Sequence, residues 1–430
     1  MIPTIQEHTL SQGTYKKALI ITKLPQAATV VDPDRTEEDK AEVKTMIVDI
    51  RTLKTENPTV EAQKIKKFTL IFSNQQLDEN NTFCSWAAIY INGLNQLKAE
   101  LLIMPEHCTE AHVTKSQEWF KTIRLPPLEV KFVDVKSAGA YSLAMTEDGK
   151  LWSRGMNDDG TWDKGTEIWR LNLHFNSGDG LIPSTHGPSK IRQFSFELHR
   201  AIIILENGAV FAYGQLHEFQ GWPNIPQIGF IELTDSNKMK PCFIDKLRGG
   251  LPGADGTFGI FGSFHVVKYF RDAKAFVTAD GIVIVQAYVE VEKKYRYCYT
   301  PIDPKFFGGE KIVHINSHVW DAYVTESGRA IITRAVYKEY QEFAAELATP
   351  QYVMQIPFPI DQLNTLIITK KTHFTALNKD GRILSIRYED GSVRDATDYV
   401  SELINADGVG EGMKIKHFGH ASVCQFFLFD

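Results

Sequence analysis

Histidine and cysteine are the residue types in this sequence whose spacing could build a metal site. The chain has 13 histidines and 5 cysteines, but the cysteines form no Cys-x-x-Cys pair. His314 and His318 are four residues apart in a segment with the pattern of a strand, where this spacing separates two side chains by about 13 Å. The sequence also contains no Gly-x-Ser-x-Gly, His-Glu-x-x-His or Walker motif. We therefore expect no catalytic residue, no metal and no cofactor, and we predict that the protein is not an enzyme.

A glycine-rich segment, residues 249–262, comes nearest to a phosphate-binding loop. It lacks the Gly-Lys-Ser/Thr ending and the strand-to-helix context that such a loop needs. Paired carboxylates such as Asp158 and Asp159 lie in turn-rich segments, where burial does not tune their pKa for acid–base work. A loop between structural units is the better interpretation of residues 249–262.

Composition places the chain among ordinary globular proteins. It has 430 residues, 43% of them hydrophobic, and a formal net charge of -6, which is adverse to binding a phosphate backbone. The odd number of scattered cysteines is typical of reduced thiols, and neither a signal peptide nor a run of about 20 apolar residues is visible. We expect an intracellular protein, nuclear or cytoplasmic, with no membrane partner and with nucleic acid unlikely as a partner.

A short pattern of apolar strand, turn and apolar strand returns five times. Each turn places Asp, Asn or Ser before a glycine, which favours a two-residue hairpin because both residues tolerate positive φ. The turn glycines recur every 47 to 73 residues and are Gly149, Gly208, Gly281, Gly328 and Gly381.

Alternating runs before the turns, such as residues 132–135, 191–194 and 312–315, add a further strand to each unit. Repeated small sheets that bury both faces against their neighbours form a β-propeller. Asn92-Gly93, after the apolar residues 86–90, indicates a weak first copy. The segment 415–429 is half a unit, which the N-terminal strands 17–22 and 45–50 are expected to complete.

The predicted fold is therefore all-β: a seven-bladed propeller whose N- and C-terminal strands close the ring, with a few short inserted helices. We expect one domain over residues 1–430. Within it, residues 1–80 supply the N-terminal strands and an acidic loop that complete the last blade, and residues 81–430 supply the repeats.

One repeat is specific enough to indicate a family. Residues 135–160 resemble a repeat of the RCC1 (regulator of chromosome condensation) family of seven-bladed propellers. The matching positions are Gly139, Gly149, Trp152, Gly155, Asn157 and Gly160. The second copy keeps Gly208, Phe211, Tyr213 and Gly214, and the other copies keep little beyond the turn.

Departures from the repeat are the expected binding elements, because insertions lie on the rims of a propeller. The long segment 156–189 carries Trp162, Trp169 and Phe175, and apolar residues at helical spacing predict a helix over 336–347 with Tyr340 and Phe343. These aromatic side chains either pack onto the protein itself or bind a partner. Shorter helices are predicted over 116–124 and 398–404.

Three functions remain open at this point. The first is a scaffold that binds one or more proteins through its rim loops or a face. The resemblance implies two others: guanine-nucleotide exchange on a small GTPase, in which a wedge displaces the nucleotide, and association with chromatin. The basic clusters available to the last are small, at residues 64–67 and 293–296.

Overall fold

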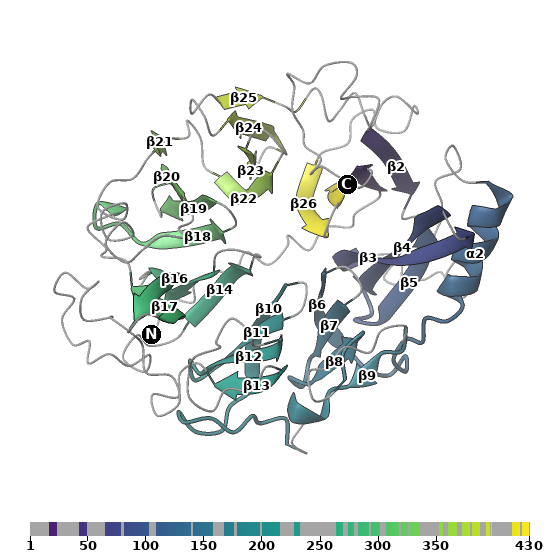
Figure 1. The fold of residues 1–430 in the computed structure, drawn as a ribbon, viewed down its shortest axis with the longest axis horizontal. Coiled ribbons are helices and arrows are strands. Elements are labelled where there is room, and N and C mark those ends of the chain that lie inside the picture. Colours follow the sequence, from purple (N-terminus) through teal and green to yellow (C-terminus); the bar gives the residue numbers. More distant parts are fainter. Residues whose placement is uncertain are drawn as a thin grey trace. The chain divides into compact units, whose positions relative to one another are not determined.

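Antiparallel sheets make up most of the described part of the protein (Figure 1). The computed structural model describes residues 17–23, 43–49, 65–78, 81–102, 109–138, 141–157, 167–175, 179–197, 200–215, 228–232, 264–269, 274–278, 283–291, 294–301, 307–317, 320–325, 327, 329–334, 352–355, 360–367, 372–378, 381–387, 393–395, 397, 415–421 and 424–429. Within these residues the strands form seven sheets, and in six of them consecutive strands pair side by side.

The first three sheets follow one another from residue 65 to residue 232. The first sheet contains β3 (Ile65–Asp78), β4 (Asn81–Asn92) and β5 (Leu97–Leu102). The second contains β6 (Phe132–Ala138), β7 (Tyr141–Thr146), β8 (Leu151–Arg154) and β9 (Arg170–Leu171), followed by the 3-10 helix η3 (Leu173–Phe175). The third contains β10 (Ile191–Glu197), β11 (Arg200–Leu205), β12 (Val210–Gln215) and β13 (Ile228–Glu232).

Three further sheets repeat this order in the second half of the chain. The fourth contains β14 (Phe264–Tyr269), β15 (Lys274–Thr278), β16 (Val283–Val291) and β17 (Lys294–Pro301). The fifth contains β18 (Ile312–Ser317), β19 (Trp320–Thr325), β20 (Arg329–Arg334) and β21 (Tyr352–Gln355). The sixth contains β22 (Ile360–Ile367), β23 (Thr372–Asn378), β24 (Ile383–Arg387) and β25 (Val393–Asp395).

The seventh sheet joins the two ends of the chain. It contains β1 (Lys17–Lys23), β2 (Val43–Asp49), β26 (Ile415–Ala421) and β27 (Cys424–Phe429), in the order β2-β1-β27-β26. Lys17 pairs with Phe429 and Thr22 pairs with Cys424 across the junction. The N-terminal strands therefore complete the C-terminal half unit, as the sequence predicts. Strand β3, which lies before residue 80, pairs with β4 and so belongs to the first sheet.

Strand β11, the second strand of the third sheet, is buried on both faces. In β11, all residues from Ala201 to Leu205 have no exposed surface. A strand in this situation lies between two packed layers and loses the alternation of a half-buried strand. This burial explains the continuous apolar run Ile202–Leu205, and it is what stacked sheets of a propeller require.

Turn glycines have the expected backbone, but the turn itself is one residue longer than predicted. Gly149, Gly208 and Gly381 have φ of 83°, 89° and 81°, whereas Gly281 and Gly328 lie outside the described residues. At the β11–β12 turn, the Gly208 N–H donates to the Leu205 carbonyl (3.0 Å) and the Leu205 N–H donates to the Ala209 carbonyl (2.9 Å). Asn207 is not among the residues with positive φ. This is a three-residue turn that ends with one left-handed glycine, in place of the predicted two-residue hairpin.

In the first sheet, an asparagine takes the place of the turn glycine. The Asn95 N–H donates to the Asn92 carbonyl and the Asn92 N–H donates to the Gln96 carbonyl, the same two bonds as at Gly208. Asn95 has φ 61°, and asparagine is the residue after glycine that best tolerates this conformation. The predicted first copy is therefore present, with Asn95 and not Gly93 at its turn.

A β-bulge recurs near the start of the first strand. The register slips after the first residue of six strands, β3, β6, β10, β18, β22 and β26. Such a bulge leaves one residue unpaired and redirects its side chain. Its repetition supports the equivalence of the sheets, and it places Lys66 and Val133 at corresponding positions.

Ion pairs also join the first strands of the first and second sheets. Lys67 on β3 and Lys136 on β6 approach the Asp134 carboxylate at 3.9 and 3.6 Å. Burial lowers the pKa of Lys136, against the effect of Asp134, and Lys67 lowers it further. The half-exposed side chain of Lys136 thus lies beside Asp134 and Lys67 where the first and second sheets meet.

Helix α2 (Glu110–Phe120) begins and ends earlier than the predicted 116–124 helix. Thr109 and His112 form a capping box, in which the Thr109 N–H donates to His112 Nδ1 (2.9 Å). This cap starts the helix six residues before Ser116. The other two predicted helices, 336–347 and 398–404, lie outside the described residues.

The chain divides into two compact units. One contains residues 1–147, 165–170 and 360–430, and the other contains residues 148–164 and 171–359. The single domain over residues 1–430 stays a prediction. The described part of the chain contains no helix with the length and hydrophobicity that a bilayer crossing requires.

Candidate partner-binding site

The aromatic residues predicted to bind a partner do not form an exposed group in the described structure. Trp169 is 3% exposed and Phe175 has no exposed surface. Of the two interpretations of the 156–189 segment, packing onto the protein itself matches their placement. Trp162, Tyr340 and Phe343 lie outside the described residues.

Phe175 belongs to an aromatic cluster between its own segment and the third sheet. Its ring meets Tyr213 edge-on with centroids 5.3 Å apart and Phe230 edge-on at 4.9 Å. Phe230 also stacks on Phe211 at 4.6 Å. Edge-to-face and stacked pairs at these distances add to the free energy of burial. Phe175 therefore fixes the 156–189 segment to strands β12 and β13.

Buried hydrogen bonds strengthen the same anchor. The Asn172 side chain donates from Nδ2 to the Tyr213 hydroxyl (2.8 Å), and that hydroxyl donates to the Asn157 carbonyl. Asn172 has no exposed surface, and its N–H donates to the Leu151 carbonyl (2.8 Å). The start of the 156–189 segment and its middle part at Asn172 are therefore bound to the protein itself.

Trp169 is held on the side of helix α2. The Trp169 N–H donates to the Arg124 carbonyl (2.9 Å), and the Arg124 N–H donates to the Glu167 carbonyl (3.0 Å). The Trp119 indole donates to the Glu167 carboxylate at 2.9 Å. The segment 167–169 thus packs as a short parallel bridge beside the end of α2.

A long β-hairpin extends the first two strands of the first sheet. β5 pairs with β4 only from Trp86 to Ile91, whereas β3 and β4 stay paired out to Asp78 and Asn81. Phe72 and Trp86 mark the base of this extra part, with ring centroids 5.1 Å apart. We call residues 72–86 the hairpin extension. At about 3.3 Å per residue its strands reach roughly 20 Å beyond the point where the third strand ends.

Helix α2 supports one face of the hairpin extension. Phe83 meets the His112 ring edge-on with centroids 4.6 Å apart, and the Ser85 and Ser116 hydroxyls share a buried hydrogen bond of 2.9 Å. His112 therefore both caps α2 and packs against the hairpin. An isolated two-stranded ribbon is marginally stable in water, so α2 gives the hairpin extension a fixed shape.

The other face of the hairpin extension is polar and lacks positive charge. Gln76 and Cys84 are exposed, and residues 72–86 contain no Lys or Arg and only two acidic residues, Asp78 and Glu79. Desolvation raises the pKa of the Cys84 thiol, so this cysteine stays protonated and a poor nucleophile at neutral pH. These properties suit contact with another protein surface.

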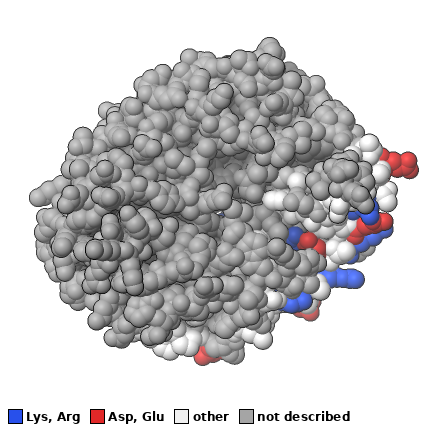
Figure 2. All heavy atoms as spheres, viewed as in Figure 1, with Lys and Arg blue, Asp and Glu red and all other residues white. Residues whose placement is uncertain are grey.

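Charges of both signs occur on the described surface that Figure 2 shows. In the view of Figure 2, basic and acidic side chains of the described residues lie next to one another. A protein that binds a phosphate backbone needs a continuous basic surface. The described residues in that view do not provide one.

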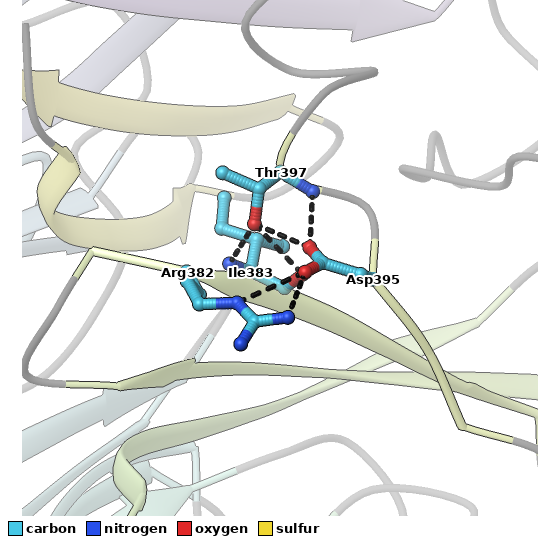
Figure 3. A network of polar contacts seen from close by, with 4 residues as sticks. All are labelled: Arg382, Ile383, Asp395 and Thr397. Carbon is cyan, nitrogen blue, oxygen red and sulfur yellow. Dashed lines mark hydrogen bonds and ion pairs between the residues drawn. The ribbon is translucent and has the colours of Figure 1, made fainter.

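A polar cluster around Asp395 joins two strands of the sixth sheet. Figure 3 shows Arg382 donating to Asp395, while the Thr397 N–H donates to Asp395 Oδ1 (2.9 Å) and the Ile383 N–H donates to Thr397 Oγ1 (2.9 Å). Burial acts to raise the pKa of Asp395, but the bonds from Thr397 and Arg382 outweigh it and the pKa is lowered. The ionised carboxylate fastens β25 to β24. No group of three metal-ligating side chains occurs in the described ranges.

Glu100 on β5 is a carboxyl group that titrates near neutral pH. Burial raises the pKa of Glu100 from 4.5 to about 7. Since the folded state binds the proton more tightly than the unfolded state, Glu100 lowers the stability of the protein as the pH rises from 4.5 through about 7.

Replacing Glu100 with glutamine is therefore expected to stabilise the protein at alkaline pH. Because the side chain is partly exposed, we expect a gain of about 1 to 2 kcal/mol at pH 8 and none at pH 4. Urea unfolding of both proteins at the two pH values measures the gain. An equal gain at both pH values would contradict burial of the charge as its cause.

One sequence signal could have revealed the hairpin extension. Seventeen residues separate the first strand residue from the turn residue in two repeats, Phe132 to Gly149 and Ile191 to Gly208. In the first repeat, 30 residues separate Ile65 from Asn95. The surplus of 13 residues equals the 15 residues of the hairpin extension less a two-residue turn, but it becomes visible only when Asn95 is recognised as the turn residue.

Comparison with known proteins finds similarity in part of the sequence and in the fold. No protein-family model matches the chain. Over 91 residues the chain is 34% identical to the protein RCC2 homolog of Xenopus laevis, a match that covers 21% of this chain and only 16% of that relative. Prp20p of Saccharomyces cerevisiae, whose structure was described with its binding to Gsp1p and histones, is 9% identical with a TM-score of 0.55, over 97% of this chain and 92% of that chain. At this identity the likeness establishes a shared fold and no more.

Proposed function

Because this chain is a β-propeller built from RCC1-like repeats, we propose that it is a non-catalytic scaffold, which binds a partner protein inside the cell through the hairpin extension and helix α2. The hairpin extension carries this proposal. It departs from the repeat, projects beyond its sheet and is held in shape by Phe83–His112 and Ser85–Ser116 contacts. A rigid projection presents a partner with surface that needs little ordering on binding.

We also propose that the seven sheets are blades of one closed ring. Their chain order supports this, together with the pairing of β1 with β27. Closure removes the open edges that a row of separate sheets would leave. A rigid ring holds the hairpin extension in a constant position.

Replacing residues 72–86 with Asn-Gly tests the binding site. This change gives the first hairpin the length of the β6–β7 hairpin, so we expect the protein to stay folded, as judged by its melting temperature. Affinity purification should lose the partners that wild type retains, and a purified partner should bind the variant at least roughly a hundredfold more weakly, since a central contact region is removed.

Two point variants make the same test without shortening the chain. Gln76→Arg places a bulky charge on the exposed face of the hairpin extension, and Glu206→Arg places one on the exposed β11–β12 turn of the third sheet. Only Gln76→Arg should weaken the binding of the purified partner. Equal affinity for wild type and for the shortened variant would overturn the proposed site.

Nucleotide exchange on a small GTPase is a second candidate function, and the hairpin extension is also the observation that favours it. A projecting ribbon with a supporting helix has the form of a wedge that displaces a nucleotide. Prp20p, which shares the fold, is described as binding Gsp1p. Faster nucleotide release from one member of a GTPase panel, lost in the shortened variant, would select exchange over scaffolding.

Association with nucleic acid is not proposed, because the net charge is -6 and the hairpin extension lacks basic residues.

A further inference from the structure

A second surface lies at the opposite end of strands β3 and β4 from the hairpin extension. Three of its side chains are apolar and exposed: Leu94 (39%), Leu128 (56%) and Val133 (39%). Val133 is the unpaired residue of the β6 bulge, which explains why this apolar side chain of a strand faces solvent.

Hydrogen bonds hold the segments that carry these residues together. Gln96 Nε2 donates to the Leu128 carbonyl (3.3 Å), and the Phe132 N–H donates to the Asn95 carbonyl (2.7 Å). The β4–β5 turn and the loop before β6 therefore form one continuous surface. We call Lys66, Leu94, Leu128, Lys131 and Val133 the turn-side surface.

Two ammonium groups border the apolar side chains. Lys66 Nζ donates to Asn95 Oδ1 (2.6 Å), and Lys131 Nζ donates to the Leu94 carbonyl (3.2 Å). Both acceptors are neutral oxygens, and neither ammonium has a carboxylate partner within the described residues. The nearby acidic groups are Glu147, which accepts from Asn95 Nδ2, and the exposed Glu129.

From this juxtaposition we propose that the turn-side surface binds a segment of a partner protein in which large apolar side chains alternate with Asp or Glu. The apolar side chains would cover Leu94, Leu128 and Val133, and the carboxylates would reach Lys66 and Lys131. The occupant is acidic because no carboxylate of the described residues forms an ion pair with either of the two lysines at the rim of the surface. This site is separate from the proposed one on the hairpin extension.

A peptide fits this surface better than a phosphate-bearing ligand does. A phosphate group would use the two ammonium groups but would leave three exposed apolar side chains in water. Burial of apolar area supplies most of the affinity in protein recognition, and rim charges mainly set selectivity. The mixture of both on one surface points to an amphipathic, acidic segment.

Selection from a random-peptide display library with the full chain as bait tests the proposal. Enriched peptides are expected to combine acidic with large apolar residues, and the best of them, synthesised as a free peptide, becomes the probe for fluorescence polarisation. Leu128→Ser should lower the affinity for the probe by roughly tenfold or more through lost apolar burial. Lys131→Gln should lower this affinity about two- to fivefold and make it less dependent on salt.

Matched variants separate this surface from general effects. Leu173→Ser removes another exposed leucine, and Lys115→Gln removes an exposed lysine on α2. Both should bind the probe like wild type, and so should the variant that lacks the hairpin extension. The proposal is overturned if no peptide is enriched, if enriched peptides carry no net negative charge, or if Leu128→Ser and Leu173→Ser bind the probe equally.

Discussion

Replacing Arg154 with methionine is expected to lower the free energy of unfolding by about 3 to 5 kcal/mol. Arg154 lies on β8, is 1% exposed and is the largest of the fully buried side chains in the described residues. A buried guanidinium is tolerated because other groups of the protein compensate its charge and its donors. Methionine fills much of the volume but leaves the groups around it without their partner, which is the costly part of the change.

Urea unfolding of Arg154→Met at neutral pH measures this loss. Arg170→Met, at an exposed position on neighbouring β9, is the matched control and should change stability by no more than about 0.5 kcal/mol. Arg154→Lys should also be destabilised, because lysine keeps the charge but not the planar fork of donors. If Arg154→Met and Arg170→Met unfold at the same urea concentration, the burial of Arg154 has no energetic role.

Replacing Phe175 with alanine is expected to cost a similar amount, about 3 to 5 kcal/mol, through the cavity that it leaves. The ring contacts Tyr213 and Phe230 and has no exposed surface, so its loss opens the cluster that fixes the insertion to the third sheet. Phe175→Leu, which keeps most of the volume, should cost less than about 2 kcal/mol.

Binding measurements on the Phe175 variants decide between the two interpretations of this residue. If Phe175 is structural, Phe175→Leu binds partners like wild type, and the effect of Phe175→Ala follows its lowered melting temperature. A Phe175→Ala protein that melts like wild type but loses a partner would show instead that the side chain leaves the cluster to bind.

The repeat could be predicted from the sequence because its turns are governed by local chemistry. Gly149, Gly208 and Gly381 adopt a left-handed backbone conformation that few residues tolerate. Their spacing along the sequence therefore indicates where successive sheets lie. The union of the chain ends was also predictable, since the apolar strand Cys424–Phe429 needs a partner and the sequence offers one at Lys17–Lys23.

The candidate site could not be predicted from the sequence, because it depends on contacts between residues that are far apart along the chain. Trp169 and Phe175 have the composition of a binding loop, and only contacts far along the chain reveal that they are buried. Asn95 replaces a glycine at the turn and so conceals the 13 extra residues of the first repeat. The start of α2 depends on His112 as the capping partner of Thr109, where Glu or Gln is the usual residue.

The pairing of β1 with β27 has a consequence for the synthesis of the protein. About 400 residues separate the two strands, so a ribosome that adds about 5 to 20 residues per second completes β27 roughly 20 to 80 s after β1. During this interval one edge of the apolar strand Lys17–Lys23 has no native partner on the nascent chain. Its protection by chaperones before release from the ribosome would then decide the yield of correctly assembled protein.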